Sequence, residues 1–148
     1  MKTLFRNISL ALVALFTVST TAMADDDRPI DFSQLPKTAQ ATVKKHFASS
    51  EVLYSTQDGI VFKTYDVVFA NGDKIEFDSK GNWKDVDMMS GAVPTAFVPA
   101  QIQNFVKKSY PGTKITKIDR DARDYEIELS NGLDLKFNKS GRLIEIDD

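Results

Sequence analysis

Two stretches of this 148-residue chain, 60 positions apart, decide its fold. Residues 65–83 read YDVVFANGDKIEFDSKGNW, and residues 125–143 read YEIELSNGLDLKFNKSGRL. Apolar and polar residues alternate on both sides of each Asn-Gly pair, which is typical of half-buried strands. Asn-Gly is a strong hairpin signal because both residues of the tight turn need a positive φ. Each stretch therefore predicts an antiparallel hairpin that leads into a third strand.

A helix is predicted before each stretch. Pro36 and Pro99 stand 63 positions apart, at the start of segments with helical apolar spacing, where helices favour proline. A further strand is expected after each helix, near 52–55 and 115–119, and the second copy is three residues shorter before its tyrosine strand. We therefore predict an α+β fold, a tandem repeat of two modules with one helix on a four-stranded antiparallel sheet. Residues 31–90 form the first predicted module and residues 91–148 the second.

These motifs resemble the PepSY-like family of exported bacterial proteins. The resemblance rests on Leu35-Pro36, on Val98-Pro99 and on the repeated Tyr-x-[Val/Ile]-x-[Phe/Leu]-x-Asn-Gly hairpins, and it covers about residues 30–148. It implies a fold similar to that of the beta-lactamase inhibitor protein, and an extracytoplasmic binding or inhibitory role. The resemblance supplies no catalytic residues. It identifies no counterparts of the inhibitor's enzyme-contacting residues, so inhibition of a beta-lactamase is not predicted.

The first 24 residues have the pattern of a secretory signal peptide. Lys2 and Arg6 precede an uncharged apolar run of 11 residues, and Ala22-Met23-Ala24 supplies the cleavage pattern. The run is shorter than the roughly 20 residues that a bilayer span needs. Cleavage after Ala24 leaves 124 residues with 17 basic and 21 acidic side chains, beginning with a flexible N-terminus over residues 25–30. We expect a periplasmic or secreted protein without a stable membrane anchor.

Composition excludes several function classes. The chain has no cysteine and one histidine, which excludes disulfides, thiolate chemistry and a metal site with several histidines. Its net charge of −2 argues against nucleic-acid binding. His46 falls near a predicted helix C-terminus, where it interacts favourably with the helix dipole. The charge run at residues 119–124 lacks the glycine and glutamate of an EF-hand loop and predicts a solvated turn. No cofactor or metal is predicted.

The candidate residues for a binding surface come from the predicted strands. Val68 stands at a polar position whose counterpart in the second copy is Glu128. Trp83, the counterpart of Leu143, either packs half-buried or forms a binding hot spot. The carboxylates lie on exposed strands rather than in a pocket that would separate their pKa values, so no enzymatic activity is predicted. The candidates are Val68, Trp83, Glu76, Glu126 and Glu128.

The leading interpretation is a non-enzymatic exported module that binds a protein or peptide of the cell envelope, including in an inhibitory role. Binding would use the sheet surface or the hairpin tips. The alternative is a periplasmic carrier of a small ligand or metal ion, which requires a pocket between helices and sheet or between the two modules.

Overall fold

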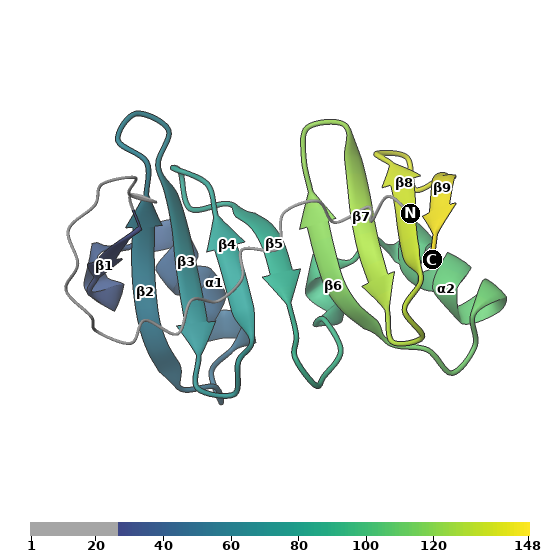
Figure 1. Ribbon diagram of the computed structural model, residues 1–148, viewed down its shortest axis with the longest axis horizontal. Coiled ribbons are helices and arrows are strands. Elements are labelled where there is room, and N and C mark those ends of the chain that lie inside the picture. Colours follow the sequence, from purple (N-terminus) through teal and green to yellow (C-terminus); the bar gives the residue numbers. More distant parts are fainter. Residues whose placement is uncertain (1–26) are drawn as a thin grey trace, which may run out of the picture.

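One antiparallel sheet runs through residues 27–148, the part of the chain that the computed structural model describes. Its strands follow one another in chain order across the whole sheet (Figure 1). The predicted signal peptide, residues 1–24, lies outside the described residues. The strands are β1 (Arg28–Ile30), β2 (Val52–Asp58), β3 (Thr64–Phe69), β4 (Lys74–Phe77), β5 (Trp83–Asp87), β6 (Ile115–Arg120), β7 (Asp124–Leu129), β8 (Asp134–Asn138) and β9 (Leu143–Asp147).

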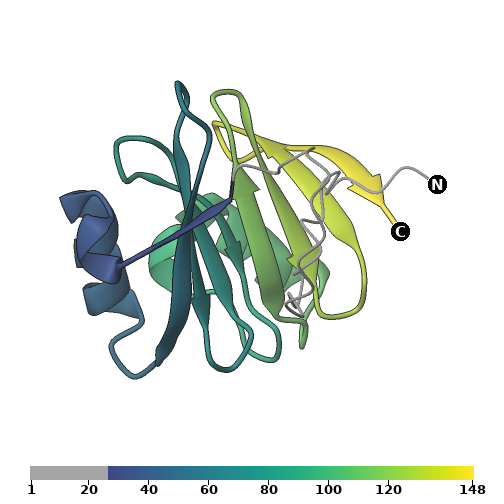
Figure 2. The same cartoon turned by 60° about the vertical axis from the view of Figure 1, so that its left-hand side comes forward.

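Two α-helices lie on one face of this sheet (Figure 2). Helix α1 (Lys37–His46) precedes β2, and α2 (Ala100–Ser109) precedes β6. A short 3₁₀ helix comes before each, η1 (Phe32–Gln34) and η2 (Thr95–Phe97). Both α-helices begin directly after a proline, as the sequence predicts. The predicted α+β class is therefore confirmed. No helix within residues 27–148 is long and apolar enough to cross a bilayer.

The two quoted stretches form hairpins at the predicted places with the same register, but the turns begin one residue earlier than a two-residue Asn-Gly turn would. The Gly72 N–H donates to the Phe69 carbonyl oxygen and the Gly132 N–H to that of Leu129, so each glycine is the last of three loop residues. Tyr65 faces Phe77 across β3 and β4, and Tyr125 faces Phe137 across β7 and β8. The turn glycines have positive φ, +91° at Gly72 and +89° at Gly132, which side chains with a Cβ rarely adopt. Each turn asparagine also accepts a hydrogen bond through its Oδ1 from a backbone N–H two residues on. Local turn chemistry thus fixes both registers.

The core lies between the helices and the sheet and continues across the middle of the molecule. Val86 of β5 faces Ile118 of β6, and both side chains are fully buried. Phe97 of η2 packs edge-on against His46, with ring centroids 5.0 Å apart, although the sequence assigns these residues to different modules. Its ring also lies 5.9 Å from that of Phe47. Residues from both halves therefore share one buried apolar cluster.

The N-terminal edge of the sheet differs from the prediction. We predict a flexible N-terminus over residues 25–30, yet residues 28–30 form β1, which pairs antiparallel with β2. Ile30 faces Ser55 and packs against the core. A three-residue strand that contains Pro29 is too short to show a period in the sequence. Its pairing gives the sheet nine strands rather than the eight expected from two four-stranded modules.

Candidate binding surfaces

The sheet face opposite the helices carries two rows of side chains that cross the strands, all of them charged except Val68. Neighbours in each row face one another in the strand register. Alternation places them there, because every second residue of each strand points away from the core. The first row is Asp66, Glu76, Asp85, Asp119, Glu126 and Lys136. The second row is Val68, Lys74, Asp87, Lys117, Glu128 and Asp134.

Lysines pair with the carboxylates of this face. Glu76 accepts a hydrogen bond from Lys84 at 3.2 Å, and Glu126 accepts one from Lys136 at 2.8 Å. A further pair joins the Lys74 Nζ to Asp66 at 2.7 Å. A partner that covered this face would have to desolvate groups that already satisfy one another, which costs free energy. The charged face is therefore a weak docking surface.

Asp85 lies at the centre of the first row, where β5 and β6 join the two halves. The pKa of this carboxyl is raised to about 7, chiefly by burial; Lys117 opposes the rise, and the nearby Asp119 and Asp87 add to it. Burial also raises the pKa of Asp119, with Glu126 adding to it. Across residues 27–148, no three acidic or histidine side chains form a group that could hold a metal ion.

Trp83 lies half-buried at the same junction. Phe97 meets its ring edge-on at a centroid distance of 5.4 Å, and the Arg120 guanidinium lies 3.8 Å above the ring. The Nε of Arg120 also donates to the Trp83 carbonyl oxygen at 2.7 Å. These contacts connect β5 to β6, so Trp83 packs against neighbouring residues of the fold and does not project into solvent as a binding hot spot would.

The structure does not gather the other predicted candidates into one site. Val68 of β3 faces the exposed Tyr54 of β2, near the first edge of the sheet. Glu76 lies on β4, whereas Glu126 and Glu128 lie on β7, with β5 and β6 between them. They belong to one charged face but are spread over its width.

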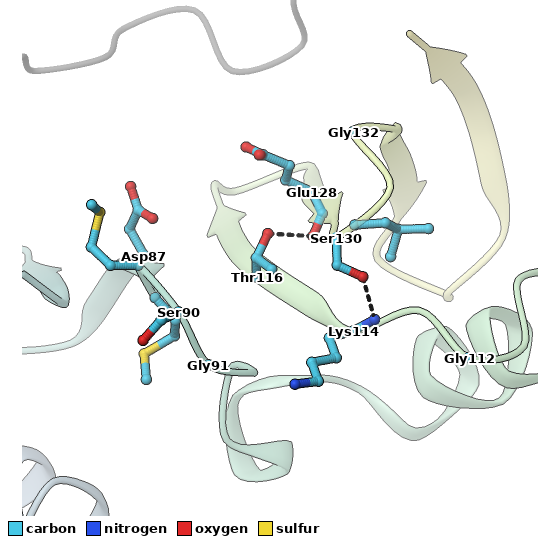
Figure 3. Close-up of a pocket in the computed structure, with 12 residues that line it drawn as sticks. Asp87, Ser90, Gly91, Gly112, Lys114, Thr116, Glu128, Ser130 and Gly132 are labelled. Atoms are coloured by element: carbon cyan, nitrogen blue, oxygen red, sulfur yellow. Dashed lines mark hydrogen bonds between the residues drawn. The ribbon is translucent and has the colours of Figure 1, made fainter.

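A shallow pocket of about 560 Å³ lies where the residues after β5 approach the starts of β6 and the β7–β8 turn (Figure 3). Asp87 and Glu128 line it from opposite sides. Two hydrogen bonds close its floor, from the Lys114 N–H to the Ser130 Oγ at 2.9 Å and from the Thr116 hydroxyl to the Glu128 carbonyl oxygen at 3.3 Å. Six of its twelve lining residues are charged or carry a hydroxyl, whereas small-molecule sites are typically lined mainly by apolar side chains.

The β2–β3 hairpin ends in a tip that projects beyond the sheet (Figure 1). This tip, residues 59–63, reads Gly-Ile-Val-Phe-Lys, and we call it the apolar tip. Ile60 is 79%, Val61 80% and Phe62 89% exposed, whereas Val67 and Phe69 of the adjoining strand β3 are fully buried. Asp58 accepts a hydrogen bond from the Gly59 N–H at 2.6 Å and so fixes the base of the tip.

Sequence reasoning missed the apolar tip. The available signal was the three-residue difference in length between the two halves, combined with a run of three large apolar residues inside a predicted loop. Loops are normally polar, and such a run between two strand patterns is an anomaly that periodicity ignores.

Comparison with known proteins places the chain in a family. The family model described as "Putative beta-lactamase-inhibitor-like, PepSY-like" matches residues 63–145. Comparison with curated proteins gives no match. Three solved structures of Bacteroides proteins are similar over nearly their whole length.

One, from Bacteroides thetaiotaomicron, is described as a "putative calcium-regulated periplasmic protein". It is 46% identical to this chain, with a TM-score of 0.81, and the match covers 84% of this chain and 98% of that one. A periplasmic protein from Bacteroides vulgatus is 47% identical, with a TM-score of 0.81 and coverages of 84% and 99%. A second Bacteroides vulgatus periplasmic protein, of unknown function, is 34% identical, with a TM-score of 0.78 and coverages of 82% and 99%.

The α+β fold and the family match define a class of sheet proteins that the family model describes as beta-lactamase-inhibitor-like. The chain belongs to the PepSY-like family. The resemblance inferred from its hairpin motifs is therefore confirmed. The periplasmic descriptions of the three relatives support a periplasmic location for this chain.

Proposed function

We propose that this protein is a non-enzymatic periplasmic binding module that docks onto a partner protein through its apolar tip. In this proposal the chain is exported by a signal peptide cleaved after Ala24, and its two halves are tandem copies of one helix-plus-sheet module. The observation that carries the proposal is the exposure of Ile60, Val61 and Phe62 on a projecting hairpin.

Exposed apolar side chains are common singly, but three consecutive ones at a convex tip mark an interaction site. Burying a side chain of this size is worth roughly 1.5–3 kcal/mol. Phenylalanine adds little conformational entropy cost, because its side chain has only two rotatable bonds. A projecting tip fits a concave apolar cleft, where a few fully desolvated side chains supply most of the binding energy. A tip that fills the cleft of an enzyme would inhibit that enzyme.

Charge favours a protein over a membrane as the partner. The tip follows Asp58 and ends in Lys63, one charge of each sign, and residues 25–148 carry a net charge of −4. Membrane-surface segments normally combine apolar side chains with a basic cluster that anionic lipids attract. The apolar tip has no such cluster in its own sequence.

The test compares two surface variants of the mature protein as bait in periplasmic extract from its source bacterium. The tip variant carries Ile60→Ser, Val61→Ser and Phe62→Ser, whereas the control carries Leu53→Ser and Met89→Ser, two other exposed apolar positions. We expect the wild type and the control to retain a specific partner and the tip variant to lose it. Retention of every specific partner by the tip variant would refute the proposal.

A further inference from the structure

The two halves of the sheet each end in a strand with the same three-residue pattern. In β5 the pattern is Asp85-Val86-Asp87, which faces Glu76, Ile75 and Lys74 of β4. In β9 it is Glu145-Ile146-Asp147, which faces Lys136, Leu135 and Asp134 of β8. Each strand thus shows acid, aliphatic and acid at equivalent register positions. The two strands differ in their outer neighbour, because β5 pairs with β6 whereas β9 is the last strand of the sheet.

Strand β6 pairs with the outer edge of β5. It therefore shows which kind of strand the acid-aliphatic-acid pattern of β5 accepts as a neighbour. Ile118 faces Val86, and both side chains are completely buried in the core cluster. The Nζ of Lys117 lies 3.5 Å from Asp85 and 3.9 Å from Asp87, so one lysine serves both carboxylates. The ligand of this edge is therefore an antiparallel strand in which a lysine precedes an aliphatic residue.

Strand β9 has no such cover among the described residues. It is the last strand of the sheet, and its outer edge faces away from β8 (Figure 1). Ile146, the positional equivalent of the buried Val86, is 52% exposed, and Ile144 is 51% exposed. An edge strand leaves every second backbone N–H and C=O unpaired, and it is a template for an added strand.

A second copy of this chain is a poor occupant of that edge. Two antiparallel β9 strands centred on Ile146 would place Glu145 opposite Asp147 of the other copy, and like charges directly opposite are destabilising. The other free edge, β1, is three residues long and contains Pro29, which lacks an N–H for pairing. The charge of β9 instead favours a basic strand.

We propose that the outer edge of β9 is a peptide-binding site that takes, by antiparallel strand addition, an extended segment with a lysine or arginine just before an aliphatic residue. The aliphatic side chain covers Ile146, and the basic group lies between Glu145 and Asp147, as Lys117 lies between Asp85 and Asp87. Backbone hydrogen bonds hold the segment, and the charges select it. This site does not depend on the apolar tip, which lies elsewhere on the sheet.

The probe is a labelled peptide with the sequence of residues 113–121, TKITKIDRD, because this segment contains the strand that covers β5. Binding to the mature protein is followed by fluorescence anisotropy and by backbone amide shifts in NMR spectra. We expect saturable binding with the largest shifts in β9 and β8. Asp147→Lys should weaken it about tenfold, and the peptide with Lys117→Glu should regain affinity for that variant but bind the wild type poorly.

Two control variants accompany this test. Ile146→Ser changes a side chain that is already half exposed, so the fold should persist while affinity falls. The tip variant with Ile60→Ser, Val61→Ser and Phe62→Ser should bind the peptide as the wild type does. The inference is overturned by absence of binding, by affinity that Asp147→Lys leaves unchanged, or by shifts confined to β5 and β7. The last result would mean that the peptide replaces β6 instead of extending β9. A tip that fails to capture a partner would leave this result unaffected.

Discussion

The hairpins β2–β3 and β6–β7 stand at equivalent places in the two halves, yet their tips differ in length and chemistry. In the second hairpin, Asp121 accepts hydrogen bonds from the Arg123 and Asp124 N–H groups and closes a short polar turn. In the first, three apolar side chains project into solvent. The strands below keep the same pairing, with Tyr65 and Tyr125 at matching positions. The sheet is thus common to both halves, and the tip that we propose as the contact surface is present in the first half only.

The largest expected effect is a difference in stability between alanine variants of two phenylalanines in the same half. Phe77 is fully buried in β4, and Phe77→Ala should lower the free energy of unfolding by about 3–5 kcal/mol, because it opens a cavity in the core. Phe62 is 89% exposed, and Phe62→Ala should change the same quantity by less than about 0.5 kcal/mol. Urea unfolding of both variants measures the contrast. A large loss of stability in Phe62→Ala would show that the tip serves the fold.

Next in size is an exchange of the two tips. Replacing residues 59–63 by the three residues Asp-Ala-Arg should weaken partner binding about a hundredfold, the loss of a hot-spot cluster worth ~2–3 kcal/mol. Grafting Gly-Ile-Val-Phe-Lys in place of residues 121–123 of that variant should restore part of the affinity, since the strands beneath share their register. Titration of the captured partner measures both. Undiminished binding by the protein with the shortened tip would contradict the view that only the apolar tip contacts the partner.

The hairpins, their turns, both helices and the family follow from residues whose roles are local. Asn71-Gly72 and Asn131-Gly132 dictate turns, and Pro36 and Pro99 mark helix starts. The pairing of β5 with β6, which joins the two halves, could not be predicted from such local residues. The pairing of Asp85 with Asp119 joins strands about thirty residues apart, and the stacking of Arg120 on Trp83 depends on it. Sequence patterns report which face a residue takes, but they do not report which strand becomes its neighbour.

Asp85, at the centre of the first row of charged side chains, should make the free energy of unfolding depend on pH, with an effect of intermediate size. The pKa of Asp85 is about 7 in the folded protein, above the ordinary 3.8, so the folded state binds the proton more tightly. Stability contributed by this group is therefore present at low pH and is lost as pH rises from about 4 to 7. Asp85→Asn should exceed the wild type in free energy of unfolding by ~1–2 kcal/mol at pH 8, and the difference should shrink toward pH 4. Parallel pH profiles for the two proteins would contradict this.

The smallest effect concerns the two Asn-Gly turns at the opposite end of the strands. A Cβ at Gly72 would lie 2.9 Å from the Met89 Cγ, whereas a Cβ at Gly132 would meet nothing within 4 Å. Both alanine variants should lose ~1–2 kcal/mol, because both turns need a positive φ. Met89 is exposed and can move, so the two losses should differ by less than about 0.5 kcal/mol. Thermal unfolding compares them, and a much larger loss at Gly72 would mean that Met89 is held in place.

The central claim is that the apolar tip, and not its polar counterpart, contacts a partner protein. The most direct measurement places a photoreactive amino acid at position 62 or at position 122 of the full chain, expressed in its own bacterium and illuminated in living cells. The account predicts a discrete crosslinked adduct from position 62, absent from position 122 and lost when Ile60→Ser and Val61→Ser are added. Adducts of equal yield from both positions, or none from position 62, would contradict it.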